Sequence, residues 1–120
     1  MKKKRSRTRD DISEETKQKR IEILQFRIAY CLKNKYNASR QEVADAMDVQ
    51  LYAVCYHEEK FLLKNKYITK IKGKINTMPR GTSVTELGKS LAEIKKYEKI
   101  PLFIRKSLKI RKKISWGELV

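Results

Sequence analysis

Few of the residues that build disulfide frameworks, metal centres and nucleophilic active sites occur in this sequence. Among its 120 residues there are two cysteines, one histidine, four glycines and two prolines. The separation of Cys31 and Cys55 matches neither metal-ligand spacing nor that of a redox pair. We therefore expect a reducing, cytoplasmic compartment rather than a secreted disulfide scaffold, with both cysteines as small core residues.

Patterns that indicate catalysis or membrane insertion are absent as well. His57 has no second histidine with which to bind a metal, and no Gly-rich phosphate loop or Ser-His-Asp set is present. No apolar run is long enough to span a membrane, and the basic residues 1–5 are not followed by the apolar stretch of a secretory signal. We expect no enzyme activity, no cofactor, no metal and no membrane partner.

Positive charge is what the sequence has in excess. The chain carries 30 basic and 14 acidic residues, a formal net charge of +16. Residues 1–9 hold six basic and no acidic residues, residues 60–85 seven and none, and residues 100–120 six and one, whereas residues 10–59 hold ten acidic residues against seven basic. Localised basic segments are typical of proteins that bind a polyanion, most often nucleic acid. A lysine-rich solvated surface is the alternative interpretation.

The first helix is predicted from the capping residue Ser13 to about Lys35. Its apolar residues form two stripes on nearly opposite faces. One stripe comprises Ile21, Leu24, Ile28, Cys31 and Leu32, and the other Ile23, Phe26 and Tyr30. We expect the first stripe to face the core and the second to form a symmetric homodimer contact. Alternatively, two helices of the same chain sandwich this one.

Two helices joined by a tight turn are predicted next. Ser39 and Glu42 have the spacing of a capping box, in which each side chain binds the other's backbone N–H. The turn falls at Asp48-Val49, and the second helix spans about residues 50–64. The residues that we expect to point inward from this helix are Leu51, Val54, Cys55, Phe61 and Leu62. Glu58 projects onto the same inner face, where a carboxylate is unfavourable.

The remaining pattern predicts a hairpin and a helix. Residues 67–72 alternate apolar and polar, residues 73–81 carry Gly, Asn and Pro turn signals, and residues 82–84 form the returning strand. Thr85 caps a helix to about Lys99, with Leu87, Leu91 and Ile94 on one face. The predicted fold class is mainly α with a small two-stranded β-hairpin. We divide the chain into a disordered basic arm (1–12), a domain (13–99) and a basic C-terminal helix or tail (100–120).

This order of elements resembles the winged helix-turn-helix superfamily over residues 17–99. The core of the resemblance is SRQEVADAMDVQLYAV, in which Ala44 lies where two helices touch and Val54 anchors the second helix. LLKNKYITKI resembles the passage into the first wing strand, and VTELGKSLAEI is similar to the start of the helix after the wing. The resemblance implies a dimeric reader of double-stranded DNA, similar in layout to the MarR and PadR groups.

The resemblance also implies which residues contact DNA. In this fold the second helix enters the major groove, and the first helix and the wing meet the backbone. The residues assigned to base contacts are Gln50, Tyr52, Ala53, Tyr56, His57 and Lys60. The residues assigned to backbone and wing contacts are Arg40, Gln41, Lys70, Lys72, Lys74 and Arg80.

Two roles fit a DNA reader of this size. Because the winged core leaves no room for a sensor domain, we expect no small-molecule effector. One role is a small homodimeric transcriptional repressor. The other is a centromere-binding adaptor similar to TubR, which would coat tandem DNA repeats and recruit a filament-forming GTPase in plasmid or phage partition.

A different class of function depends on the C-terminal segment. Residues 102–116 are predicted to form a basic amphipathic helix that clamps the DNA backbone or lies on a membrane surface. The membrane interpretation uses an apolar side made of Phe103, Ile104, Leu108, Ile110 and Trp116. RNA binding would require aromatic residues on a sheet or single-strand platform, whereas the strands expected here belong to a two-stranded wing. We favour DNA because the N-terminal arm and the wing are basic too.

Overall fold

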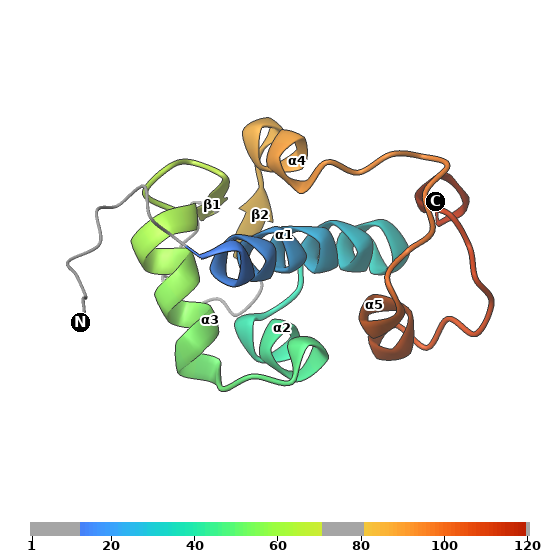
Figure 1. Cartoon of the computed structure of the whole chain (residues 1–120), viewed down its shortest axis with the longest axis horizontal. Helices are drawn as coiled ribbons and strands as arrows, with labels where there is room; N and C mark the ends of the chain where they lie inside the picture. The colour runs from blue at the N-terminus through green and yellow to red at the C-terminus, as the bar shows by residue number, and fades with distance from the viewer. Residues whose placement is uncertain (1–12, 71–80, 120) are drawn as a thin grey trace, which may run out of the picture.

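A computed structural model describes residues 13–70 and 81–119 of the chain (Figure 1). The elements follow in the order α1 (Glu14–Asn34), α2 (Arg40–Met47), α3 (Leu51–His57), the π-helical segment η1 (Glu58–Leu62), β1 (Ile68–Lys70), β2 (Thr82–Val84), α4 (Glu86–Ala92), α5 (Leu102–Ser107) and the 3-10 turn η2 (Trp116–Glu118). The two strands pair antiparallel, with Ile68 opposite Val84 and Lys70 opposite Thr82. The predicted class, mainly helical with one small antiparallel hairpin, is confirmed.

Short-range capping signals begin three of the helices where the sequence predicts them. The Ser13 hydroxyl accepts a hydrogen bond from the Thr16 backbone N–H, and the Thr85 hydroxyl accepts one from that of Gly88. Ser39 and Glu42 form the reciprocal capping box of α2. Each bond satisfies a backbone donor that the first helical turn leaves free, and for this reason a few neighbouring residues suffice to predict the helix start.

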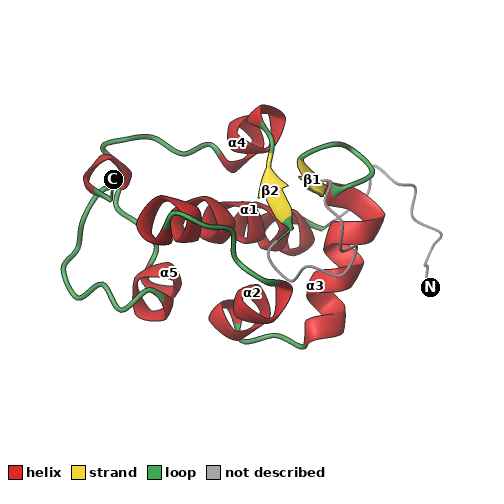
Figure 2. Ribbon diagram, turned by 180° about the vertical axis from the view of Figure 1, so that it is seen from behind, coloured by secondary structure: helices red, strands yellow, loops and turns green. Residues whose placement is uncertain are grey.

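Helix α1 passes through the middle of the molecule, with α4 along one side and α2 along the other (Figures 1 and 2). Both of its apolar stripes are therefore used within one chain. Ile23 and Phe26 have no exposed surface and Tyr30 is buried. The predicted dimer contact through Ile23, Phe26 and Tyr30 is wrong, and the alternative of a helix sandwiched by its own chain is correct. Helical spacing shows that a face is apolar but not what covers it.

Three residues expected to point inward are exposed instead. Cys31, Leu51 and Leu87 each lie in the first or last turn of their helix. The apolar spacing of each helix runs to its ends, but the neighbouring elements cover only the middle of the helix. Cys55, the other cysteine, is half-buried and so is not a full core residue either.

The C-terminal segment folds back onto the domain instead of forming one long helix. Helix α5 ends at Ser107, and Lys109 has a positive φ of 59° that reverses the chain. The returning backbone pairs with the loop before α5, where the Trp116 N–H donates to the Glu98 carbonyl at 2.9 Å. Ile104, Leu108 and Trp116 are buried in the core. The predicted helix over residues 102–116 is therefore wrong, and three residues of its expected membrane-facing side are not available to a membrane.

A close backbone contact holds the hairpin against α4. The Thr85 hydroxyl lies 2.6 Å from the Lys66 carbonyl oxygen and 3.0 Å from that of Tyr67, within reach of donating to either. Gly88 sits so close to the same place that a Cβ atom there would lie 2.1 Å from the Tyr67 oxygen. A larger residue at position 88 would push α4 away from the start of β1.

The carboxylate of Glu58 is completely buried, as its inward position in the sequence suggests. Arg27 of α1 donates to both of its oxygens, at 2.6 and 3.1 Å, and Arg40 of α2 donates to one of them at 2.7 Å. Arg27 also donates to the Ala38 carbonyl at 2.8 Å. Glu58 begins η1, so these bonds connect α1, the start of α2 and the end of α3.

Removing the charge of Glu58 should destabilise the fold strongly. Glu58→Gln keeps the shape of the side chain but leaves Arg27 buried without a counter-charge, so we expect a loss of about 3–5 kcal/mol in the free energy of unfolding. Urea unfolding measures it. The matched double variant Arg27→Met/Glu58→Leu leaves no uncompensated buried charge and should be more stable than the single variant. A single variant as stable as the wild type would contradict this assignment.

Candidate nucleic-acid interface

The outer face of α3 is the most exposed aromatic surface on the described helices. Val54 of α3 and Leu62 of η1 are buried, so they define the inner side of these two segments. On the outer side Tyr52 is 75% exposed and Tyr56 is 56% exposed. Gln50, at the N-cap, and Lys60, in η1, are exposed as well. Four of the six residues predicted to contact bases therefore lie on an open face, as helical spacing indicates.

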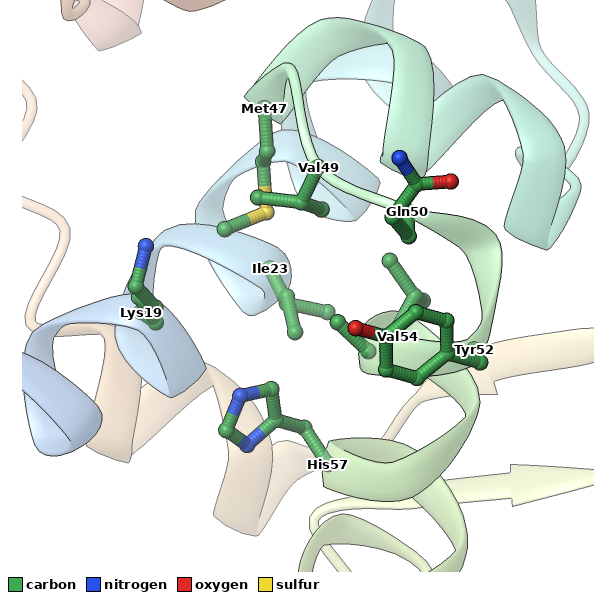
Figure 3. Close-up of a pocket in the computed structure, with 9 residues that line it drawn as sticks. Lys19, Ile23, Met47, Val49, Gln50, Tyr52, Val54 and His57 are labelled. Atoms are coloured by element: carbon green, nitrogen blue, oxygen red, sulfur yellow. The ribbon is translucent and has the colours of Figure 1, made fainter.

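A pocket of about 340 Å³ lies beside this face, between α1, the turn after α2, and α3 (Figure 3). Its walls are mostly apolar, and Lys19 and Tyr52 stand on opposite sides of it. The lining residues are Lys19, Ile23, Met47, Val49, Gln50, Tyr52, Ala53, Val54 and His57. The structure thus brings Gln50, Tyr52, Ala53 and His57 together around one hollow, whereas Tyr56 and Lys60 lie outside it.

His57 is half-buried and held by α1. The buried Arg20 guanidinium stacks on Phe61, 4.0 Å from the ring centre, and its Nε–H donates to His57 Nδ1 at 3.3 Å. Because Nδ1 accepts this bond, the ring proton of the neutral imidazole is on Nε2. Burial, reinforced by the charges of Arg20 and Lys19, lowers the pKa of His57. His57 is therefore neutral near pH 7 and offers a donor rather than a positive charge.

The two predicted backbone contacts on α2 are engaged within the chain. Arg40 donates to the carboxylates of Glu58 and Glu59, and Gln41 donates to Asp45 at 2.9 Å. Burial alone would lower the pKa of Arg40, but its hydrogen bonds to the two carboxylates raise it, so its charge is permanent. In the free chain the guanidinium of Arg40 is therefore not an open phosphate contact, because it is held between two carboxylates.

Of the predicted wing residues, the structure places Lys70. Its side chain is exposed at the end of β1, and its ammonium lies 3.3 Å from the Glu59 carboxylate. Lys72, Lys74 and Arg80 lie outside the described residues, as does the arm of residues 1–12. Lys64 and Lys66, in the turn between η1 and β1, are exposed and add to the positive surface on this side.

Three residues important to this region have no clear signal in the sequence. Lys19 and Arg20 occur in the predicted first helix, but only the crossing of α1 and α3 brings them to the pocket and to His57. Glu59 stands out only as the neighbour of Glu58, and its two basic partners are 19 and 11 positions away. Contacts of this kind depend on tertiary packing, which a local pattern does not encode.

A scan against protein-family models and searches of curated proteins and of solved structures find no significant match to this chain. Within the described residues no group of three or more His, Cys, Asp or Glu residues could hold a metal ion. No helix in the same residues is long and apolar enough to cross a membrane.

Acidification should destabilise the fold through His57. The unfolded chain binds a proton at His57 near pH 6.5, whereas the folded chain does so only at a lower pH because its pKa is lowered. The stability that depends on the neutral ring is complete above about pH 6.5 and is lost as the pH falls through the range between the two pKa values. Urea unfolding at about pH 7.5 and about pH 5.5 measures this loss, which for one group is at most about 1.4 kcal/mol per pH unit.

His57→Gln is the control for this experiment. Glutamine does not titrate, so the variant should lose less stability than the wild type between the two pH values. An equal loss in both proteins would assign the pH dependence to other groups.

Proposed function

We propose that this chain is a winged helix-turn-helix protein that reads double-stranded DNA with the outer face of α3. The observation that carries the proposal is the combination on that face of Gln50, Tyr52 and Tyr56 with exposed lysines beyond it. Helix α2, the turn at Asp48 and α3 have the order of a helix-turn-helix, and the antiparallel strands β1 and β2 come after η1. This order supports the winged interpretation.

The distribution of charge supports a polyanionic partner. Lys60, Lys64, Lys66 and Lys70 are all exposed and follow α3 in a stretch, residues 60–85, that contains no acidic residue. Lysine ammonium groups near a duplex gain affinity by releasing the counterions of its phosphates. This term is independent of base sequence and would hold the protein on DNA while α3 samples the groove.

The side chains of α3 suit recognition of base edges. The side-chain amide of Gln50 can form two hydrogen bonds with one adenine base. The tyrosine rings can make apolar contact with thymine methyl groups, and their hydroxyl groups can donate or accept a hydrogen bond. Among the large hydrophobic residues exposed in the described part of the chain, Leu51, Tyr52 and Tyr56 all belong to this seven-residue helix. Exposed apolar area concentrated in this way favours contact with a partner.

Transcriptional repression is the role that we propose for this DNA reader, with partition as the alternative outcome of the test below. A homodimer remains part of the proposal, because paired half-sites are the usual target of helix-turn-helix proteins. Since Ile23, Phe26 and Tyr30 are buried, such a dimer has to use another surface.

Selection and sequencing of bound fragments of the source genome tests the function. At about 0.2 M salt the phosphate contribution is weakened and base reading decides which fragments are retained. A lone inverted repeat at a promoter is the result expected for a repressor. A tandem array beside the gene of a filament-forming GTPase would instead indicate the partition role, and absence of any enriched site would contradict sequence-specific reading.

Truncating Tyr56 should relax sequence preference. Tyr56→Ala removes an exposed ring from the last turn of α3, so we expect the ratio of affinities for the selected duplex and a mixed-sequence duplex to fall about tenfold. Competition titrations at constant salt measure this ratio. Tyr97→Ala is the matched control, since Tyr97 is also an exposed tyrosine, in the loop after α4. An unchanged ratio in Tyr56→Ala, or an equal fall in Tyr97→Ala, would show that α3 is not the reading helix.

A further inference from the structure

One carboxylate, that of Glu59, joins two of the predicted phosphate contacts, Arg40 and Lys70. The Glu59 Oε2 atom accepts from Arg40 Nη2, at the start of α2, and from Lys70 Nζ, at the end of β1, the latter at 3.3 Å. The two cations come from elements on either side of η1. They converge on a single anionic oxygen.

The cluster is held from inside and open to solvent on its outer side. Glu58 holds Arg40 Nε at 2.7 Å from inside, which directs the rest of the guanidinium toward Glu59. The outer part of the cluster is open, because the side chain of Glu59 is 44% exposed and that of Lys70 is 57% exposed. Hydrogen bonding to Arg40, and then to Lys70, lowers the pKa of Glu59, so the carboxylate stays ionised at neutral pH.

We propose that Arg40 and Lys70 form a binding site for a backbone phosphate of duplex DNA, and that Glu59 occupies this site in the free protein. The inference rests on the proposed function. Carboxylate and phosphate present the same kind of oxygen to a guanidinium and an ammonium group. When a phosphate arrives, Glu59 swings into solvent from its exposed position, while Glu58 keeps Arg40 oriented.

Such an exchange weakens binding to every duplex. The phosphate gains two cationic partners, but the protein gives up the two contacts of Glu59, and the displaced carboxylate lies near a polyanion. Exposed ion pairs contribute about 0.2–1 kcal/mol, so the opposing effect is modest. It lowers affinity for every duplex equally, and duplexes without good base contacts are the first to be lost.

Glu59→Gln tests this exchange. The amide keeps the size of the side chain but releases the charge of Arg40 and Lys70. Affinity for a mixed-sequence duplex two helical turns long should rise about three- to tenfold, and the plot of log affinity against log salt should steepen by about one unit. Fluorescence anisotropy at several salt concentrations measures both, and urea unfolding checks that the fold is retained.

Glu86→Gln is the matched control for lost negative charge. Glu86 is also exposed and paired with a lysine, at 3.1 Å from Lys89, but on α4, which packs on the opposite side of α1 from α2. This variant should change affinity less than about twofold. If both variants raise affinity equally, the effect is one of net charge and the proposed exchange at Glu59 is wrong.

A double variant ties the effect to the site itself. If Glu59 blocks Lys70, the gain from Glu59→Gln should shrink when Lys70→Gln is already present. An undiminished gain would overturn the assignment of Lys70. If the wild type binds duplex DNA but Glu59→Gln has no specific effect, this inference alone is wrong. If no variant binds duplex DNA at low salt, the proposed function is wrong as well.

Discussion

The buried carboxylate of Glu58 is the contact on which the arrangement of α1, α2 and η1 depends. A carboxylate without water loses several kcal/mol of solvation, and only charge and hydrogen bonds at its oxygens recover it. Arg27 and Arg40 supply three such bonds, and they come from two different helices. Guanidinium–carboxylate bonds are directional, so they restrict the angles between these helices more narrowly than apolar packing does.

The same interaction continues from the core to the surface. Arg27 is buried, Arg40 is partly exposed, and beyond it Glu59 and Lys70 are open to solvent. The positions of these charges are therefore coupled: the buried end fixes Arg40, and Arg40 fixes where an outer anion binds. The π-helical segment η1 carries both carboxylates, and wide helical turns of this kind are frequent at functional sites. Because Glu58 holds Arg40 from inside, Arg40 can exchange Glu59 for another anion while the N-terminus of α2 keeps its position in the fold.

Interactions between residues close in sequence could be predicted from the sequence, whereas those between distant residues could not. Ser39 and Glu42 predicted the start of α2, and the alternation around Ile68 predicted the first strand, because these signals act within a few residues. The outer face of α3 followed in the same way from helical spacing. The partner of Ile23 did not, since an apolar face packs equally well on its own chain or on a copy. Glu58 was recognisable as a misplaced acid, but Arg27 lies 31 positions away and only the crossing of two helices identifies it.

The chain divides its positive charge between two residue types by position. Of the arginines in the described residues, Arg20 and Arg27 are buried, Arg40 and Arg105 are half-buried and Arg111 is exposed, whereas every lysine there except the half-buried Lys19 is exposed. A guanidinium is weakly hydrated and offers several donors in one plane, so it tolerates burial against a carboxylate, a carbonyl or an aromatic ring. An ammonium group is strongly hydrated and remains at the surface. Arginine therefore stabilises the fold, and the lysines produce the long-range, salt-sensitive field that attracts a polyanion. The pairs of Arg27 and Arg40 with Glu58 and Glu59 already cancel within the net charge of +16, so this excess belongs to the other basic residues.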